Sequence, residues 1–140
     1  MNSQQYARLF EQLTPASIED FEQIFSHDAH FCDPFNDVRG VSAIQGVFRH
    51  MFEQCEQPRF EILEVVEQGA LAYFYWRFRF HRGQDGYVIE GVSRVAFDEA
   101  GKVQSHVDYW DPTVLYHKLP LLGRVLAWLR NRLGAELART

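Results

Sequence analysis

The spacing of apolar residues divides the chain into a helical first part and a strand-rich second part. Before Pro58, apolar side chains recur every three or four residues, the spacing of one face of an α-helix. This spacing predicts helices over residues 4–13 and 42–54. Between them a further helix is expected to begin after Ser17, which can cap it, because Asp20 follows three residues later.

Strands are predicted where the helical spacing gives way. A short strand at residues 29–32 is expected to end at Pro34, because proline cannot donate to a strand ladder, and residues 35–40 should form a loop. The longer predicted strands cover residues 60–67, 70–81, 87–97 and 102–110. The last three should form an antiparallel meander. Helices first and a meander after predict an α+β fold, with the helices packed on one face of a curved, mainly antiparallel sheet.

The end of the chain carries a separate amphipathic pattern. Pro112 closes a domain of residues 1–112, and residues 113–140 form a helical extension. A helix over residues 119–137 would place on one side Leu122, Val125, Leu126, Leu129 and Leu133. We expect this helix to pack on the same domain or on a partner subunit. Membrane contact is the less favoured alternative, because anionic lipid binding usually needs a denser basic cluster of about 4–8 residues.

Composition narrows the classes of function. With 46% hydrophobic and 15% aromatic residues, the 140-residue chain has enough apolar material for a core and a pocket wall. The formal net charge of −5 argues against nucleic-acid binding, which normally needs a basic face. The sequence shows no apolar leader and no run of about 18 apolar residues, so a cytoplasmic protein is expected. Cys32 and Cys55 lack metal-ligand spacing and the histidines form no ligand motif, so no metal is expected.

The strongest candidate chemistry lies at the end of the last predicted strand. Alternate residues of a strand share a face, so His106, Asp108 and Trp110 should point the same way. Aspartate is uncommon in the middle of a strand, and a pocket role would explain it. A His-Asp pair suits proton transfer but equally fits a buried structural pair. Asp33 either caps the turn at Pro34 or serves as a base, and we expect it to border one cavity with the other three.

The order of elements resembles the SnoaL-like and ketosteroid-isomerase-like families of the NTF2-like superfamily. The resemblance covers about residues 6–111. Two motifs carry it: HFCDPFNDVRG at residues 30–40, and GKV at 101–103 leading to DYWD at 108–111. The resemblance implies a cone-shaped α+β barrel with a deep apolar pocket, commonly assembled as a homodimer sheet to sheet.

The resemblance also implies roles for individual residues. Asp33 matches the general base of ketosteroid isomerases, while Tyr6 and Ser93 fall near their two oxyanion donors, one of which is a neutral carboxylic acid in those enzymes. Ligand contacts are expected from Tyr6, Asn36, Trp76, Ser93 and Trp110.

The second motif resembles limonene-epoxide-hydrolase-like proteins, in which the residue matching Asp108 belongs to an Asp-Arg-Asp triad. Residues 76–79 of this chain, WRFR, lack the second carboxylate of that triad. SnoaL-type polyketide cyclases use a pocket aspartate as acid and base, a role that Asp108 or Asp33 could fill.

Together these patterns predict a cofactor-independent isomerase, cyclase or hydrolase acting on a small hydrophobic molecule. Asp33 or Asp108 would move the proton, His106 would assist, and Tyr6 or Ser93 would donate to a developing oxyanion. The alternative is a non-catalytic small-molecule-binding or protein-interaction module of the same fold. Residues 70–81 carry aromatic side chains on both strand faces, which predicts that both faces are covered and that the chain forms a homodimer through its sheet.

Overall fold

The computed structural model describes residues 1–116 and 120–139, except the side chains of residues 120–122 and 135–139. It divides into two compact units, Met1–Trp110 and Asp111–Thr140. Each unit is described by itself below.

The first unit begins with short helices. They are α1 (Ser3–Glu11), the 3-10 helix η1 (Pro15–Asp20), α2 (Phe21–Ile24) and, after two strands, α3 (Val41–Gln54). The helix predicted to begin after Ser17 is wrong in both its start and its extent. Thr14 is the cap, because its hydroxyl accepts a hydrogen bond from the Ser17 backbone and Pro15 occupies the first helical position. The chain then leaves the helical conformation at Phe25.

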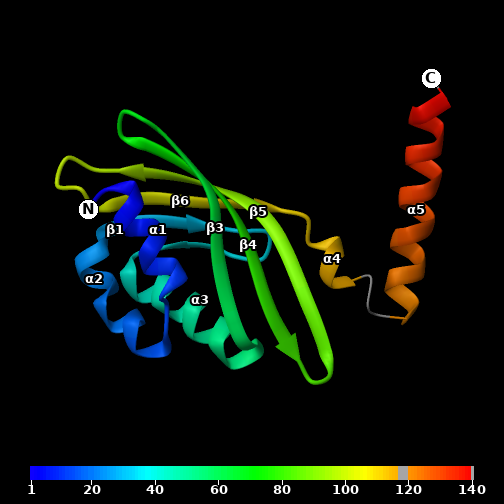
Figure 1. Ribbon diagram of the computed structural model, residues 1–140, viewed down its shortest axis with the longest axis horizontal. Coiled ribbons are helices and arrows are strands. Elements are labelled where there is room, and N and C mark those ends of the chain that lie inside the picture. The colour runs from blue at the N-terminus through cyan, green and yellow to red at the C-terminus, as the bar shows by residue number, and fades with distance from the viewer. Residues whose placement is uncertain (117–119, 140) are drawn as a thin grey trace. The chain divides into compact units, whose positions relative to one another are not determined.

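The sheet has six strands. They are β1 (Phe25–Cys32), β2 (Asp37–Arg39), β3 (Glu56–Gln68), β4 (Leu71–Arg82), β5 (Asp85–Phe97) and β6 (Val103–Trp110). Their order is β2-β1-β6-β5-β4-β3, and every pair is antiparallel except β1 with β6 (Figure 1). The predicted meander of β4, β5 and β6 is confirmed. The loop expected at residues 35–40 is wrong in part, because β2 pairs there with β1 across a tight turn.

The helices cover one face of this sheet, which we call the inner face. α1 packs against β3, and α3 packs against β1 (Figure 1). Strand β4 shows the two faces plainly: Phe74, Trp76 and Phe78 are buried on the inner face, while Tyr73 is exposed on the outer face. This arrangement confirms the α+β fold with helices packed on a curved, mainly antiparallel sheet.

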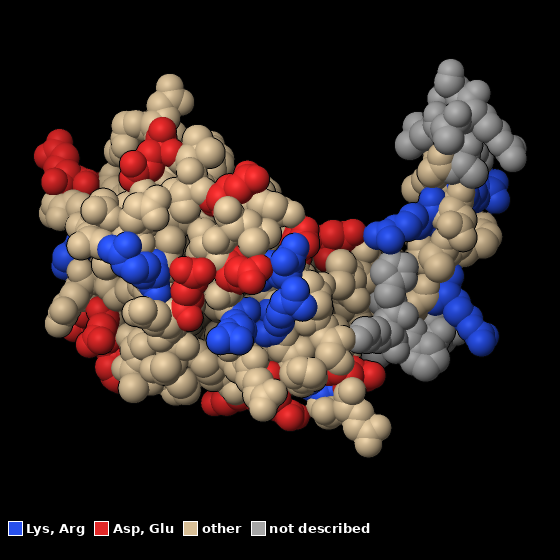
Figure 2. Space-filling model, in the orientation of Figure 1, with Lys and Arg blue, Asp and Glu red and all other residues tan. Residues whose placement is uncertain are grey.

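The second unit consists of α4 (Thr113–Tyr116) and α5 (Pro120–Arg139). Arg130 pairs with Asp111 at 3.0 Å, and arginine side chains project from α5 in Figure 2. Apolar side chains exposed on this helix are Val125, Trp128, Leu129 and Leu133. Leu119, where the predicted helix begins, and the side chain of Leu122, part of the predicted stripe, lie outside the described residues. The partner on which this helix docks stays a prediction. Within the described residues, no helix combines the length and the apolar character needed to cross a membrane.

Candidate active site

A cavity of about 40 Å³ lies between α1 and the inner face of the sheet. Its apolar wall consists of Ala7, Phe10, Phe48, Phe60, Ile62, Phe74 and Trp76. Four further side chains bring polar atoms to it: Tyr6, Ser93, His106 and Asp108. The cavity therefore combines an apolar wall with a few convergent polar groups, the usual composition of a small-molecule site.

The polar side chains form one continuous chain of hydrogen bonds. The Tyr6 hydroxyl lies 2.7 Å from Nδ1 of His106, and Nε2 of His106 lies 2.7 Å from Oδ1 of Asp108. The Ser93 hydroxyl donates to the same Oδ1 through a short contact, and the Trp76 indole donates to Ser93 Oγ at 2.8 Å. Tyr6, Trp76, Ser93 and His106 are all buried.

Only one arrangement of protons satisfies every donor when Asp108 is ionised. The indole N–H can only donate, so Ser93 accepts from Trp76 and turns its own hydrogen toward Asp108. An ionised carboxylate only accepts, so His106 must donate from Nε2 and accept the Tyr6 hydrogen at Nδ1. His106 is then a neutral imidazole in one defined tautomer, an assignment that rests on the hydrogen-bond network.

Burial controls the chemistry of Tyr6. The pKa of its phenol is raised well above the usual value, first by desolvation and second by the negative charge of Asp108. The phenol therefore stays protonated and serves as a hydrogen-bond donor to His106.

One oxygen of Asp108 has no hydrogen-bond donor among the described residues. Oδ1 accepts from both His106 and Ser93, whereas no donor in the described part of the chain bonds Oδ2. The Asp108 side chain is 16% exposed and borders the cavity. Its carboxylate is thus held firmly through one oxygen while the lone pairs of the other remain available to a ligand.

The strand register explains why these side chains meet. Ser93 on β5 lies directly opposite Asp108 on β6, and Trp76 on β4 lies opposite Gly91 on β5. A Cβ atom at Gly91 would lie only 2.7 Å from the indole ring of Trp76. Gly91 therefore leaves room for the indole to reach Ser93, a role that the sequence analysis missed. The available signal was a glycine inside a strand, which often marks close approach of another group.

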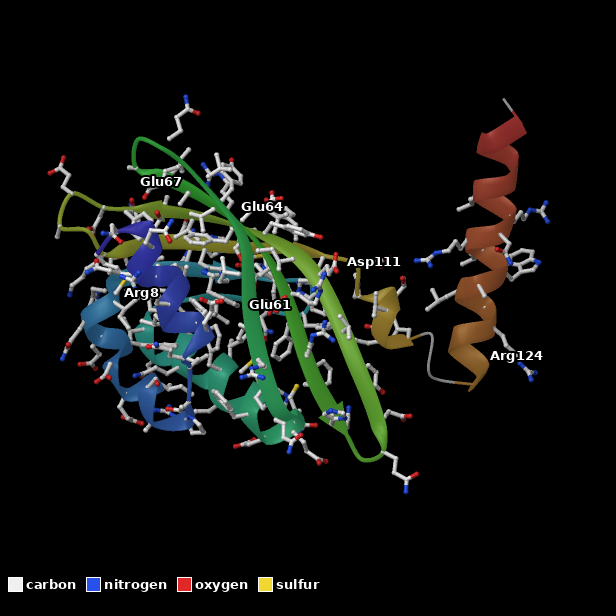
Figure 3. The ribbon with its side chains drawn as sticks, viewed as in Figure 1. Arg8, Glu61, Glu64, Glu67, Asp111 and Arg124 are labelled. Carbon is white, nitrogen blue, oxygen red and sulfur yellow. The ribbon has the colours of Figure 1, made fainter. Side chains whose placement is uncertain are left out.

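Helix α1 carries Tyr6 and is fastened to β3 at both ends. The Ser3 backbone donates to the Glu67 carboxylate at 3.3 Å, and the Ile62 backbone donates to the Glu11 carboxylate at 3.2 Å. Figure 3 labels Glu67 near the start of α1. These two contacts hold the phenol over His106.

The expectation that Asp33 and Trp110 would border the same cavity is wrong. The Asp33 carboxylate caps the turn after β1, because it accepts from the backbone of Phe35 at 2.8 Å and of Asn36 at 2.7 Å. The side-chain amide of Asn36 donates a hydrogen bond to the same carboxylate. The ring of Trp110 contacts Phe35, with ring centres 5.6 Å apart. Of the four residues expected at one cavity, the structure brings together His106 and Asp108.

A second, larger cavity of about 490 Å³ adjoins the first. Phe10 and Phe60 border both cavities, and their rings meet edge to face with centres 5.7 Å apart. Charged side chains also line the larger cavity, including Glu11, Arg59 and Arg79. The two phenylalanine rings are therefore common to the cavity beside the acid–base group and to a space large enough for a small organic molecule.

Comparison with known proteins gives a consistent result. Residues 6–106 match the SnoaL-like domain family, which confirms the resemblance to that family. No curated protein matches the chain significantly.

Solved structures share the fold at low identity. A protein of ketosteroid isomerase-like fold from Catenulispora acidiphila, in complex with trimethylamine, shares 13% identity over 78% of this chain and 84% of its own, with a TM-score of 0.67. A proposed SnoaL-like polyketide cyclase from Shewanella putrefaciens shares 18% identity over 86% of this chain and 98% of its own, with a TM-score of 0.69. A proposed isomerase of the SnoaL-like family from Agrobacterium tumefaciens shares 17% identity over 78% of this chain and 93% of its own, with a TM-score of 0.58. These identities establish the fold alone.

Proposed function

The chain belongs to the SnoaL-like domain family, and within that family we propose that it is a cofactor-independent enzyme that moves a proton on a small hydrophobic molecule. The family hosts several reactions, so the proposal rests on the site. The observation that carries it is the unbound Oδ2 of Asp108, which borders an apolar cavity while Oδ1 is held by His106 and Ser93.

Asp108 is the proposed general base. Its Oδ2 would remove a proton from a carbon next to a carbonyl group; the electron pair of the C–H bond would form a C=C bond, and the π pair of the carbonyl would move onto its oxygen. Return of that proton to another carbon completes an isomerisation. Attack of the deprotonated carbon on a second carbonyl, whose oxygen then takes the proton back from Asp108, completes a cyclisation. His106 is a positioning residue: it holds the carboxylate through Nε2 and is itself fixed by Tyr6.

Access to Asp108 would require the rings of Phe10 and Phe60 to move. A cavity of about 40 Å³ holds little more than one water molecule, whose share of liquid volume is about 30 Å³. The adjoining cavity of about 490 Å³ falls in the usual range for ligand sites, about 300–1,000 Å³. We therefore propose that the ligand occupies the larger cavity and reaches Asp108 past the two rings.

The competing function is a non-catalytic binding module. The observation that favours it is that Tyr6 and Ser93 both direct their hydroxyl hydrogens to protein acceptors. Stabilisation of a developing oxyanion usually contributes most to catalysis of this kind. To stabilise an oxyanion, one of these hydroxyl groups would have to turn away from its present acceptor.

Hydrogen–deuterium exchange separates the two functions. The full-length protein is incubated in D2O with a panel of enolisable ketones and 1,3-diketones, and deuterium at carbon is measured by NMR. We expect the protein to accelerate exchange, and Asp108→Asn to lose about 10²–10⁴-fold of that acceleration, the usual contribution of a general base. Asp33→Asn is the matched control and should retain it, because Asp33 is the turn cap.

Three results would count against the enzyme proposal or its base. Binding of the ketones without accelerated exchange favours the binding module. Loss of exchange in Asp33→Asn, with retention in Asp108→Asn, assigns the base to Asp33. Equal exchange in all three proteins shows that neither aspartate is the base.

We further propose that a second copy of the chain covers the outer face of β3–β6. Val66, Tyr73 and Tyr109 are exposed there. Arg77 on the same face pairs with Glu61 at 3.1 Å and with Glu90 at 2.9 Å, and Figure 2 shows acidic and basic side chains interspersed on the visible surface. Charges that are paired in this way can meet their own copies in a two-fold interface with little repulsion.

Light scattering tests the assembly. The wild-type protein is expected to give a dimer mass at micromolar concentration and Tyr109→Arg a monomer mass, because the new charge would be buried at the interface. Gln54→Arg, at an exposed position of helix α3 on the helix-covered side of the sheet, is the control and should stay dimeric. A monomeric wild-type protein would overturn the proposal.

A further inference from the structure

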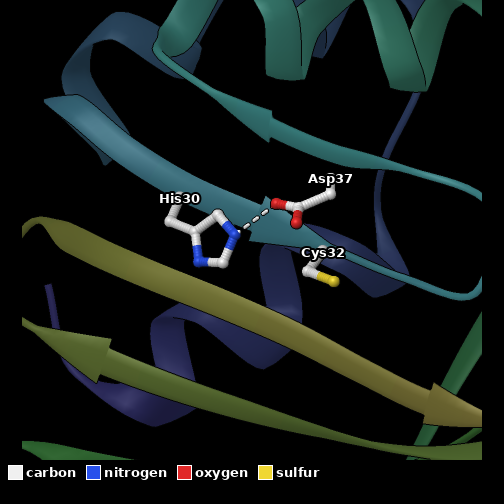
Figure 4. A group of neighbouring side chains, drawn as sticks. All are labelled: His30, Cys32 and Asp37. Carbon is white, nitrogen blue, oxygen red and sulfur yellow. Dashed lines mark hydrogen bonds and ion pairs between the residues drawn. The ribbon is translucent and has the colours of Figure 1, made fainter.

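Three side chains capable of binding a metal gather at the edge of the sheet. His30 and Cys32 come from β1 and Asp37 comes from β2 (Figure 4). Nε2 of His30 lies 2.6 Å from Oδ1 of Asp37, and the donor atoms of all three residues lie within 4.8 Å of one another. None of these three residues lines the cavity beside Asp108.

The backbone brings the three donors together. His30 and Cys32 are two residues apart on one strand, so their side chains share a face. Asp37 lies directly opposite Cys32 in the antiparallel pair of β1 and β2. The turn between the strands is held by the Asp33 backbone, which donates to the Asn36 carbonyl at 2.8 Å, and by the Asp33 carboxylate. The spacing of the donors is therefore set by regular strand pairing and a capped turn.

The three donors face away from the acid–base group. Phe31, which lies between His30 and Cys32, points to the inner face and contacts His106, with ring centres 5.0 Å apart. Its two neighbours therefore point to the outer face. A ligand bound at the sheet edge would be separated from Asp108 by the sheet itself.

We propose that His30, Cys32 and Asp37 form a binding site for Zn²⁺, with a water molecule as the fourth ligand. Imidazole nitrogen, thiolate sulfur and carboxylate oxygen are the ligands that zinc takes in proteins, at about 2.0–2.3 Å. Those bond lengths place tetrahedral donors roughly 3.3–3.8 Å apart. The His30–Asp37 contact must widen, and the longest separation, which is at most 4.8 Å, must close by no more than about 1.5 Å. Side-chain rotation can supply a change of this size. Mg²⁺ and Ca²⁺ prefer all-oxygen sites, so the histidine and cysteine select against them.

The electrostatic surroundings suit a cation. Burial raises the pKa of the Cys32 thiol, and the negative charges of Asp37, Asp33 and Asp108 raise it further. The same carboxylates that oppose a thiolate attract a divalent cation. Within the described residues, the thiol makes one long contact, 3.8 Å to the Asp33 carbonyl. If the cluster were only an ion pair between His30 and Asp37, the Cys32 thiol beside them would have no part in it.

Zinc at this position would have a structural effect. Strand β2 has only three residues and lies at the edge of the sheet, and Gly40, which precedes α3, donates to the Ala29 carbonyl at 2.8 Å. A metal that joins β1 to β2 would fasten this edge and the start of α3. No metal was expected from the sequence, because the cysteines lack metal-ligand spacing and the histidines form no ligand motif. Asp37 becomes a neighbour of His30 and Cys32 only across the turn.

Calorimetric titration of the metal-free, untagged, full-length protein with Zn²⁺ tests the site. One equivalent should bind and raise the melting temperature. Cys32→Ser is expected to weaken binding roughly 100-fold or more, because even loss of a residue that only orients a metal ligand costs 10–100-fold. Cys55→Ser removes the other described cysteine and is the matched control, with unchanged affinity expected.

Cobalt provides a signature that a purely structural role of Cys32 would not show. Co²⁺ bound at this site should give a thiolate-to-metal charge-transfer absorption in the wild-type protein and in Cys55→Ser, and none in Cys32→Ser. If Cys32→Ser fails to fold, Asp37→Asn replaces it in the calorimetric titration and should weaken zinc binding, since Asp37 is exposed and its loss should leave the fold intact. Zinc binding weaker than millimolar, or equal zinc binding by wild type and Cys32→Ser, would overturn the proposal. Ketone exchange is measured separately, and its failure leaves this result untouched.

Discussion

Two histidine–carboxylate pairs lie in the same sheet with nearly the same geometry and in opposite environments. His106 and Asp108 are 2.7 Å apart with side chains 5% and 16% exposed, whereas His30 and Asp37 are 2.6 Å apart with side chains 26% and 74% exposed. The first pair is enclosed by hydrogen bonds from Tyr6 and Ser93. The second stands beside a thiol at the sheet edge. Distance alone therefore does not distinguish an acid–base group from a surface pair, and burial together with the remaining partners does.

The two pairs should differ most in how far loss of the histidine lowers the free energy of unfolding. His106→Ala leaves the Tyr6 hydroxyl and the Asp108 carboxylate without their shared partner and opens a gap in the core. It should lower the free energy of unfolding by roughly 3–5 kcal/mol. His30→Ala in the metal-free protein should cost under about 1 kcal/mol, as exposed pairs do. Urea unfolding measures both, and equal losses would remove the distinction between the pairs.

The Trp76 indole, which donates to Ser93 beside the buried pair, is the next most important contact for stability. Gly91→Ala places a methyl group 2.7 Å from the Trp76 ring and should push the indole away from Ser93. Overpacking of this kind costs about 1–3 kcal/mol. Gly46→Ala is the control, because nothing lies within 4 Å of its added Cβ in helix α3, and it should stabilise the protein by about 0.5–1 kcal/mol. Thermal melts that shift in the same direction for both variants would contradict the account.

Burial of the Tyr6 phenol should show in the alkaline limb of the stability curve. The raised pKa means that the folded protein holds the phenolic proton to higher pH than the unfolded chain. This contribution is complete below the unfolded pKa of about 10 and is lost as pH rises above it. Tyr6→Phe should therefore lower stability at neutral pH by about 1 kcal/mol and decline less steeply above about pH 10. Parallel curves for the two proteins would show that Tyr6 does not titrate differently on folding.

The smallest effect is expected at the exposed pair. Asp37→Asn in the presence of a chelator should change the free energy of unfolding by less than about 1 kcal/mol. A loss as large as that of His106→Ala would mean that the sheet-edge pair stabilises the fold without a metal.

The sequence predicts the buried pair better than the exposed one. Alternation along β6 is a property of neighbouring residues, so it placed His106 and Asp108 on one face, and the structure confirms that both border one cavity. The prediction for Asp33 failed because an aspartate before a proline can either border a cavity or cap a turn. Here backbone N–H groups two and three residues further along the chain bind its carboxylate. The geometry of the turn decides between these two roles, and the sequence pattern does not reveal that geometry.

Other features depend on contacts between distant segments. The role of Gly91 depends on Trp76 of the adjacent strand, and the cluster at the sheet edge depends on the pairing of Cys32 with Asp37. Strand β2 was missed because its three residues show no apolar alternation. Each of these features follows from register, which is set by the folded sheet.

The most direct test of the account compares one carboxylate from each pair in the deuterium-exchange measurement. With the ketone that the wild-type protein exchanges fastest, Asp108→Asn should lose about 10²–10⁴-fold of the acceleration, and Asp37→Asn should stay within about twofold of the wild-type rate, because its carboxylate lies on the other face of the sheet. Equal losses in the two variants, or full retention by Asp108→Asn, would contradict the claim that the buried pair moves the proton.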